Sequence, residues 1–201
     1  MTTEKKLLDN GKVQVIETTE IDRYRGGWEY DECETDFMIE DFLANHKAWI
    51  CKNREGFEKL ATGENWEPEC GNVEKDLESF QNYLDETYGK DKYEAYALGA
   101  LVHGSVSFAF NKSDDTRCRW DSGTCGFVGI SKESKIDVGV YASNLSDAWN
   151  GSIERIYVYD NLEDDFVDEI TSLASQKEIS EWKAQMKEKY GIDDYKDNNR
   201  Y

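Results

Sequence analysis

Aromatic side chains are abundant in this acidic chain, and they require it to fold around a core. The 201 residues include six tryptophans, twelve tyrosines and eight phenylalanines, and 38% of all residues are hydrophobic. Acidic tails that stay disordered are poor in aromatic residues, because they have little apolar surface to bury. The single proline also excludes a proline-rich linker or tail. The length fits one large domain or two small ones.

The charge of the chain restricts the partners that it can bind. Forty-three Asp and Glu residues against 24 Lys and Arg residues give a net charge of −19 at pH 7. A field of this sign repels DNA, RNA and anionic lipid, and it accelerates encounters with positively charged proteins. We therefore expect a basic protein partner, no direct contact with nucleic acid and no membrane partner. Acidity that only confers solubility, and a salt-adapted surface, are the two simpler explanations.

Two segments carry the apolar spacing of amphipathic helices. Over residues 72–88, Asn72 supplies an N-cap, and Gly89 stands where a left-handed residue ends a helix. Over residues 176–190, the preceding string Ser175-Gln176-Lys177-Glu178 forms a capping box. The apolar residues of each helix recur at intervals of three and four and so share one face: Val73, Leu77, Phe80 and Leu84 on the first, and Ile179, Trp182, Met186 and Tyr190 on the second.

The remaining segments predict one more helix and a set of strands. Residues 34–50 hold apolar residues at mixed helical spacings behind an acidic first half, which suits a helix N-terminus. Residues 94–110 contain no Lys or Arg, and their small and β-prone residues predict two strands separated near His103-Gly104. Residues 192–201 have the composition of a frayed polar end. Alternating or short apolar runs predict the other strands: 12–17, 124–130, 136–142 and 153–159.

Together these elements predict an α+β fold. The sheet is expected to be antiparallel and to occupy about residues 94–160. Composition divides the chain into an acidic, mainly helical region over residues 1–90 and a sheet-containing region with the C-terminal helix over residues 91–201. A single domain that includes both regions is the alternative. The flanking helices are expected at about 34–50, 72–88 and 176–190.

The carboxylates gather in three clusters that contain almost no cations. Residues 29–41 and 163–169 include no basic residue, and residues 64–86 include only Lys75. Side chains three or four positions apart on a helix lie about 5–6 Å apart, a distance comparable with the roughly 3.4 Å of axis per phosphate along one DNA strand. A merely solvated surface is the alternative. The clusters predict a partner-binding face made of these residues: Glu29, Asp31, Glu32, Glu34, Asp36, Glu40, Asp41, Glu74, Glu78, Glu163, Asp164 and Asp165.

The cysteines and the acidic loops predict no metal site and no cofactor. The five cysteines are irregularly spaced and form no C-x-x-C pattern, so no zinc site is expected. No loop fits the D-x-[DN]-x-[DN]-G pattern of an EF-hand calcium site. Free thiols and an N-terminus without an apolar signal segment indicate a cytoplasmic protein, in its own cell or in a phage host. The cysteines are Cys33, Cys51, Cys70, Cys118 and Cys125.

A small enzyme is the competing interpretation, with a site around His103, Ser105, Trp120 and Asp121. A Ser/His nucleophilic pair requires contact in space and a third orienting group, and the sequence contains no nucleophile elbow. A histidine hydrogen-bonded within a sheet is the simpler interpretation of His103. Three nearby glycines do not form a G-x-G-x-x-G loop and are expected in tight turns or close strand packing: Gly123, Gly126 and Gly129.

Two strings resemble a pattern in phage- and mobile-element-borne proteins of unassigned function. Residues 102–107 read Val-His-Gly-Ser-Val-Ser, and residues 117–128 contain Arg-Trp-Asp-Ser-Gly followed by Gly-Phe-Val. Those proteins carry a His-Ser-Gly strand, an Arg/Pro-Trp-Asp-Ser-Gly turn and a Gly-Phe-Ile/Val strand. The order here is His-Gly-Ser, and the likeness covers about residues 94–132. The resemblance implies a phage or mobile-element setting and implies no activity.

The expected function follows from the charge, its clustering and this resemblance. We expect a phage-type inhibitor of a host nucleic-acid-targeting defence system, of the anti-CRISPR or anti-restriction kind, and not an enzyme. Such an inhibitor occupies a basic nucleic-acid channel by presenting carboxylates in place of phosphates, and its partner is a nucleic-acid-binding protein or nuclease complex. An immunity protein against a basic nuclease toxin is the alternative that uses the same physics. The oligomeric state stays open.

Overall fold

The computed structural model describes residues 2–8, 11–18, 23–51 and 56–197. The chain has an α+β fold of helices and mostly antiparallel sheets. It divides into two compact units, described separately below. The central unit is Asp31–Ile153, and the terminal unit combines Met1–Tyr30 with Glu154–Tyr201.

The central unit is built on a four-stranded antiparallel sheet with the order β4-β7-β5-β6. A bulge between Leu98 and Gly99 shifts the register of β5 on β7. Two short 3₁₀ turns lie in the connections, at Glu58–Leu60 and Lys132–Ser134. The strands are β4 (Lys47–Ile50), β5 (Tyr93–Val102), β6 (Val106–Asn111) and β7 (Ser122–Ser131), and the helices are α1 (Glu32–Asn45), α2 (Val73–Tyr88) and α3 (Val138–Trp149).

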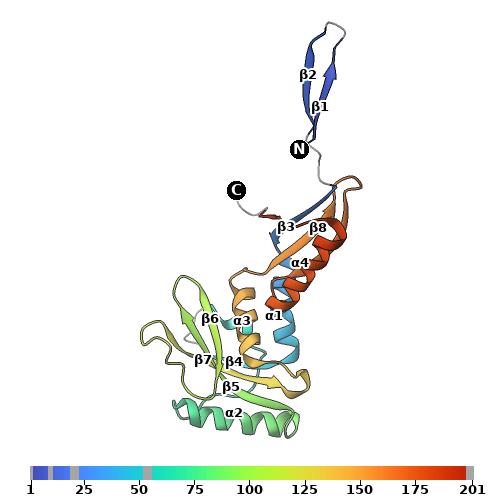
Figure 1. Ribbon diagram of the computed structural model, residues 1–201. Coiled ribbons are helices and arrows are strands. Elements are labelled where there is room, and N and C mark those ends of the chain that lie inside the picture. The colour runs from blue at the N-terminus through green and yellow to red at the C-terminus, as the bar shows by residue number, and fades with distance from the viewer. Residues whose placement is uncertain (1, 9–10, 19–22, 52–55, 198–201) are drawn as a thin grey trace. The chain divides into compact units, whose positions relative to one another are not determined.

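Helices cover both faces of this sheet, as Figure 1 shows for α2 on one side and for α1 and α3 on the other. Neighbouring strand residues point to opposite faces, and each face buries its own apolar set. Leu98 and Val128 pack with Phe42 of α1 under α1 and α3. Ala97 and Phe127, each one position away, pack under α2. The two helical layers therefore have separate cores.

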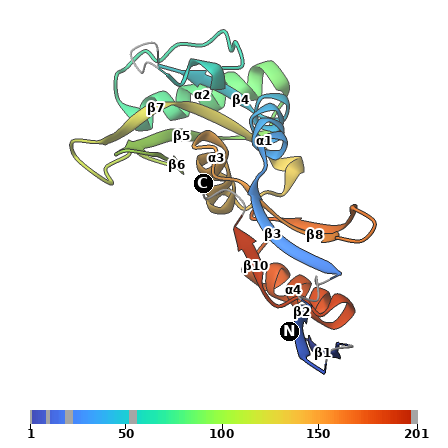
Figure 2. The ribbon, with the colours of Figure 1, turned by 90° about the horizontal axis from the view of Figure 1, so that it is seen from above.

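The terminal unit contains a second four-stranded sheet with the order β10-β3-β8-β9. Its pairs are antiparallel except for β10, which runs parallel to β3 and beside it in Figure 2. The helix α4 packs on one face through Ile179, Trp182 and Met186, against Ile156 and Val158 of β8. A two-stranded antiparallel hairpin precedes this sheet in the chain. The elements are β1 (Thr2–Leu7), β2 (Val13–Thr18), β3 (Tyr24–Tyr30), β8 (Glu154–Asp160), β9 (Asp165–Thr171), α4 (Gln176–Tyr190) and β10 (Tyr195–Asp197).

Most of the expected elements are confirmed. The helices at 72–88 and 176–190 are α2 and α4, with Asn72 accepting from the backbone of Lys75 and the capping box of Ser175 and Glu178 formed. Gly191 ends α4 in the left-handed conformation. The strand pair within 94–110 is β5 and β6, with the break at residues 103–105. The strands expected at 12–17, 124–130 and 153–159 are β2, β7 and β8.

The strand expected at 136–142 is wrong, because α3 begins there. Asp137 caps the helix by accepting from the backbone N–H groups of Gly139 and Val140, which outweighs the β preference of the valines. Tyr141, Ala142, Leu145 and Ala148 then recur on one buried face. The expected single sheet over 94–160 is likewise two sheets, because β8 pairs with β3 and β9.

Two further expectations differ from the structure. The helix expected at 34–50 ends at Asn45, and residues 47–50 form β4, whose Ala48 and Ile50 are buried. The polar end expected from residue 192 includes buried Ile192 and the strand β10, and residues 198–201 lie outside the described part. The compact units divide after Tyr30 and after Ile153, and the described part of residues 1–90 includes the strands β1 to β4 as well as α1 and α2. Among the described residues, no helix is long and apolar enough to cross a membrane.

Side chains of α3 and of Asn150, which caps the end of this helix, cover the outer edge of β6. Asn150 accepts from the backbone N–H of Val106 at 2.9 Å and donates to its carbonyl at 2.7 Å, as a neighbouring strand does. Ser146 accepts from the backbone N–H of Phe108 at 2.8 Å. Uncovered edges pair with other chains, so these contacts protect β6 from association.

Asn150→Ala is expected to lower the free energy of unfolding by about 1–3 kcal/mol, because it removes two hydrogen bonds to Val106 and a third to the carbonyl of Ser146. The freed edge is also expected to increase light scattering near the unfolding temperature. Asn144→Ala on the same helix is the control, and it should leave both measurements unchanged. Equal denaturation midpoints for Asn150→Ala and the unmodified chain would show that the side chain does not support the edge.

Candidate partner-binding site

The helix α1 displays carboxylates on its exposed side. Glu32, Asp36 and Glu40 are exposed and stand four residues apart, which places them in one row. Within the described part of the chain none of them forms an ion pair, and α1 itself has no Lys or Arg. The opposite side of the helix packs into the core through Phe42, so the row cannot turn inward. Its charges remain unneutralised in solvent.

An aromatic ring stands beside this row. Phe37 is 60% exposed although phenylalanine is usually buried. Its helical neighbours at three or four positions include Glu40 and Asp41. We call Glu32, Asp36, Phe37 and Glu40 the acidic helix face. It combines an apolar anchor with a charged surround, the composition of an interface centre and its rim.

The other residues of the first cluster have local roles. Asp31 caps α1 by accepting from the backbone N–H of Glu34 at 3.0 Å. Glu34 and Asp41 are half-buried. Glu29 lies in the terminal unit and forms an ion pair with Arg155, which also binds Glu169 at 3.0 Å. The negative charge of Glu29 is therefore largely neutralised by Arg155 within the fold.

The second cluster divides into structural and exposed carboxylates. Asp76 is only 3% exposed and accepts from the backbone N–H of Glu69 and Cys70, so it holds the loop before α2. Another carboxylate, Glu64, accepts from the hydroxyls of Tyr83 and Tyr88 at 3.0 and 2.8 Å. Burial and then these bonds to Glu64 raise the pKa of both tyrosines. Three exposed carboxylates remain along α2: Glu74, Glu78 and Glu86.

The rows on α1 and α2 do not form one surface. The two helices pack on opposite faces of the central sheet, each over its own core (Figure 1). A single flat partner surface can therefore contact one row at a time. From the sequence we expected both rows in one face. The spacing of apolar residues within a helix does not tell on which face of a sheet that helix packs.

The third cluster lies in the β8–β9 turn of the terminal unit. Glu163, Asp164 and Asp165 are exposed, and Asp164 adopts a left-handed backbone conformation with φ of +53°. Arg23 binds Asp160 at 3.0 Å and reaches Glu163 at 3.6 Å. Burial raises the pKa of Asp160, but bonds from the Leu162 backbone and from Arg23 outweigh it and hold that pKa below its usual value. The turn is a second exposed acidic surface, partly neutralised by Arg23.

The structure brings His103 and Asp121 together, as the enzyme interpretation requires. The Nδ1 atom of His103 lies 3.1 Å from Oδ2 of Asp121, and the Cys118 thiol lies 3.8 Å from the same oxygen. The histidine side chain is 84% exposed. Among the described residues, no hydrogen bond joins the His103 ring to the Cys118 thiol or to the Ser105 hydroxyl, although a nucleophile requires such contact with its base. Ser105 is exposed, and its carbonyl accepts from the backbone N–H of His103 at 3.0 Å, so these contacts orient the loop.

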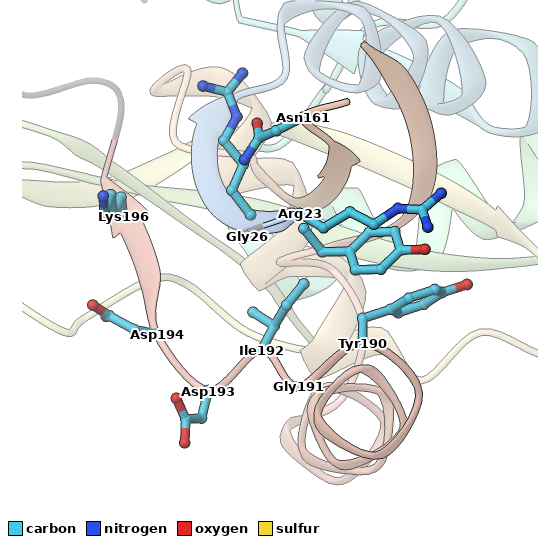
Figure 3. A pocket seen from close by; sticks show the side chains of 11 residues that line it. Arg23, Gly26, Asn161, Tyr190, Gly191, Ile192, Asp193, Asp194 and Lys196 are labelled. Carbon is cyan, nitrogen blue, oxygen red and sulfur yellow. The ribbon is translucent and has the colours of Figure 1, made fainter. Parts of the chain in front are cut away.

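A cleft of about 890 Å³ in the terminal unit lies between the start of β3 and the segment that follows α4 (Figure 3). Arg23 lines one side, and Asp193 and Asp194 lie on the segment between α4 and β10. Arg23 is bound to Asp160, and Asp193 accepts from Lys187 at 2.9 Å. Arg25 and Lys196 also line the cleft, against the remaining Asp194. The lining therefore holds three basic side chains and two carboxylates, a small positive surplus that points to no particular ligand.

Sequence reasoning found the carboxylates and missed the apolar groups among them. Phe37 is one of the apolar residues at mixed helical spacings in the segment 34–50, and the spacing alone did not mark it as exposed. Leu162 and Phe166, 70% and 49% exposed in the third cluster, are two further apolar groups without a sequence signal. A signal was present for Phe37, because it lies off the buried stripe of Met38, Ile39 and Phe42. In the described residues, no three His, Cys, Asp or Glu side chains are grouped so as to hold a metal ion.

No protein-family model, no curated protein and no solved structure matches this chain.

Proposed function

We propose that this chain is an acidic inhibitor of a host nucleic-acid-targeting defence system, of the anti-CRISPR or anti-restriction kind. Its acidic helix face occupies the basic channel in which the target holds nucleic acid. The observation that supports the proposal is the exposed row of Glu32, Asp36 and Glu40 beside Phe37, on a chain with a net charge of −19.

The spacing of the row suits a phosphate-binding surface. Carboxylates four residues apart on a helix lie about 5–6 Å apart. Lys and Arg side chains that line a nucleic-acid channel can follow such a row as they follow a strand, releasing their counterions as they do on DNA. Like charges at this spacing destabilise a helix by about 0.2–0.5 kcal/mol per pair. The row therefore has a small cost in stability that binding to a basic surface offsets.

Phe37 supplies lasting affinity, which charge alone does not provide. Electrostatic attraction accelerates association, but exposed ion pairs contribute little to lasting affinity. A large apolar side chain at the centre of an interface commonly contributes most to a slow dissociation. The acidic helix face thus has separate groups for the encounter and for the retention of its target.

An immunity protein against a basic nuclease toxin is the second candidate, and the same face supports it. The two candidates differ in the target: a defence complex holds a nucleic-acid guide or recognises invading DNA, whereas a toxin is a single catalytic domain. A panel that includes a CRISPR effector–guide complex, a type I restriction enzyme and a toxin nuclease domain separates them.

The test compares two triple variants with the same change in net charge. Glu32→Lys, Asp36→Lys and Glu40→Lys together are expected to weaken inhibition of the sensitive target by about 100-fold, at roughly 1 kcal/mol per reversed contact. Phe37→Ala is expected to weaken it by about 10-fold, mainly through faster dissociation. Inhibition constants measured at several salt concentrations should show a steep loss of affinity with salt in the unmodified chain.

The matched control reverses Glu74, Glu78 and Glu86 on α2, on the other face of the sheet. It should retain inhibition within about threefold, because only its overall charge changes. An equal loss in both triple variants would reduce the proposal to a non-specific charge effect. If no panel member is inhibited, or if His103→Ala alone abolishes the activity of the chain, the inhibitor proposal is wrong.

A further inference from the structure

Trp120 is the most exposed large apolar side chain in the described part of the molecule. Its relative exposure is 86%, in the loop that joins β6 to β7. Tryptophan is highly buried on average, and one side chain can bury about 150–250 Å². An indole left in water therefore calls for an explanation. Trp120 is not part of the acidic helix face on α1, so the proposed function does not explain its exposure.

The base of this loop is clamped by a buried ion pair. The Asp115 side chain is 1% exposed and accepts from Nε of Arg117 at 3.0 Å and from its terminal nitrogen at 2.7 Å. Arg117 also donates to the hydroxyl and the carbonyl of Ser107 on β6, at 3.1 and 2.8 Å. Burial raises the pKa of Asp115, but the bonds from Arg117 outweigh it and keep that pKa below its usual value. The loop is thus tied to β6.

A second set of bonds holds the residues on either side of Trp120. The Ser122 hydroxyl accepts from the backbone N–H of Cys118 and donates to its carbonyl, both at 2.7 Å. Asp121 contacts the His103 ring at 3.1 Å, and its carbonyl accepts from the backbone N–H of Val102 at 2.9 Å. Trp120 lies within this bonded turn. Its backbone is therefore ordered before any partner arrives, which lowers the entropic cost of binding.

The tip of the loop is cationic although the chain is strongly acidic. Residues 116–120 contain two arginines and no carboxylate. Arg117 is neutralised by Asp115, whereas Arg119 forms no ion pair within the described residues. The guanidinium carbon of Arg119 lies 5.6 Å from the centre of the Trp120 ring. An indole and an unpaired guanidinium are thus presented together.

We infer that the Arg119–Trp120 tip is a protein-docking anchor, which inserts the indole into an apolar pocket whose rim carries carboxylates. Trp and Arg are the residue types most enriched among the energetically dominant residues of protein interfaces. A rigid loop that carries an aromatic anchor is also the arrangement by which antibody loops bind proteins. Single-stranded nucleic acid also stacks on aromatic rings, but it carries a phosphate at every nucleotide, and the net charge of −19 repels it more strongly than a few carboxylates on the rim of a pocket. This surface is independent of the acidic helix face.

The test selects peptides with the full chain as bait. A displayed library of random dodecapeptides is first depleted on the Trp120→Ala chain and then selected on the unmodified chain. The depletion removes basic peptides that bind the acidic surfaces, because those surfaces are unchanged in the variant. The peptides that remain are expected to share two or more apolar positions beside Asp or Glu.

A synthetic peptide with that consensus then serves as the binding probe. Trp120→Ala is expected to weaken its binding at least about 10-fold and Arg119→Glu about fivefold. Leu162→Ala, which removes another exposed apolar side chain, should leave binding unchanged. In chain labelled with 5-fluorotryptophan, the peptide should shift the resonance that Trp120→Phe removes and no other. Failure to enrich any consensus, a Lys- and Arg-rich consensus, or equal binding by Trp120→Ala would each overturn the inference.

Discussion

Lowering the pH from 6.5 to 4 is expected to reduce the free energy of unfolding by about 3 kcal/mol through His46 alone. His46 directly follows the last residue of α1, and its side chain is completely buried. The ring lies between Phe42 and Tyr141, with ring centres 5.6 and 5.0 Å away. It is therefore surrounded by apolar groups at the end of the helix that carries the acidic helix face.

The bonding of the His46 ring favours its neutral form. Nδ1 accepts from the backbone N–H of Ser131 at 3.4 Å, and Nε2 is buried without a hydrogen-bond partner among the described residues. A proton on the ring would place a charge against the aromatic rings of Phe42 and Tyr141. Burial lowers the pKa of His46 from 6.5 to about 4, against a smaller upward effect of Asp41.

The direction of the pH dependence follows from which state binds the proton. The unfolded chain takes up a proton near pH 6.5, whereas the folded chain does so only near pH 4. The stabilisation is complete above pH 6.5 and is lost as the pH falls, at about 1.4 kcal/mol per pH unit. Below the pKa of His46 in the folded chain, both the folded and the unfolded states bind the proton. The free energy of unfolding then falls no further through this group.

Urea denaturation at a series of pH values measures this loss. His46→Leu removes the titrating group at similar volume, so its free energy of unfolding should fall less steeply between pH 6.5 and 4. His103→Gln removes the other histidine, whose ring is exposed, and should retain the full loss. Parallel curves for His46→Leu and the unmodified chain would mean that His46 is not the group responsible.

The elements that the sequence predicted correctly are those whose signals are local. Caps and an apolar stripe of four residues, three of them buried, determine α2 and α4 almost by themselves. The segment after residue 32 is harder, because the apolar residues of α1 and β4 run together without a glycine or proline between them. There the buried His46 and the pairing of Lys47–Ile50 with β7 decide where the helix ends. The paired residues of β7 lie about 80 positions later in the sequence, so the sequence of residues 47–50 does not indicate the pairing.

The site was predictable in its chemistry and not in its geometry. Charge counting identifies the acidic clusters, but it cannot distinguish the exposed Glu74 from the buried Asp76 two residues later. Nor can it tell which carboxylates are neutralised, because the Glu29–Arg155 pair forms between strands distant in the chain. The contact of His103 with Asp121 similarly depends on the pairing of β5 with β7.

Gly126→Ala is expected to lower the free energy of unfolding by about 2–3 kcal/mol, the cost of forcing an extra carbon into a close-packed site. Gly126 lies on β7 opposite Ile50 of β4. A Cβ atom there would overlap the backbone carbonyl of Trp49 and lie 2.8 Å from Cδ1 of Ile50. The strand cannot shift freely, since the backbone N–H of Cys51 donates to the Cys125 carbonyl at 2.9 Å.

The effect should reach the acidic helix face, because β4 follows α1 directly and both pack into the same core. Gly139→Ala is the matched control. Its Cβ atom would meet only Oδ1 of Asp137 at 3.4 Å, in the first turn of α3, where alanine is a better helix former than glycine. Thermal denaturation should therefore show a lower melting temperature for Gly126→Ala and an equal or higher one for Gly139→Ala. A similar shift in both variants would indicate that loss of backbone freedom, and not the contact with β4, determines the result.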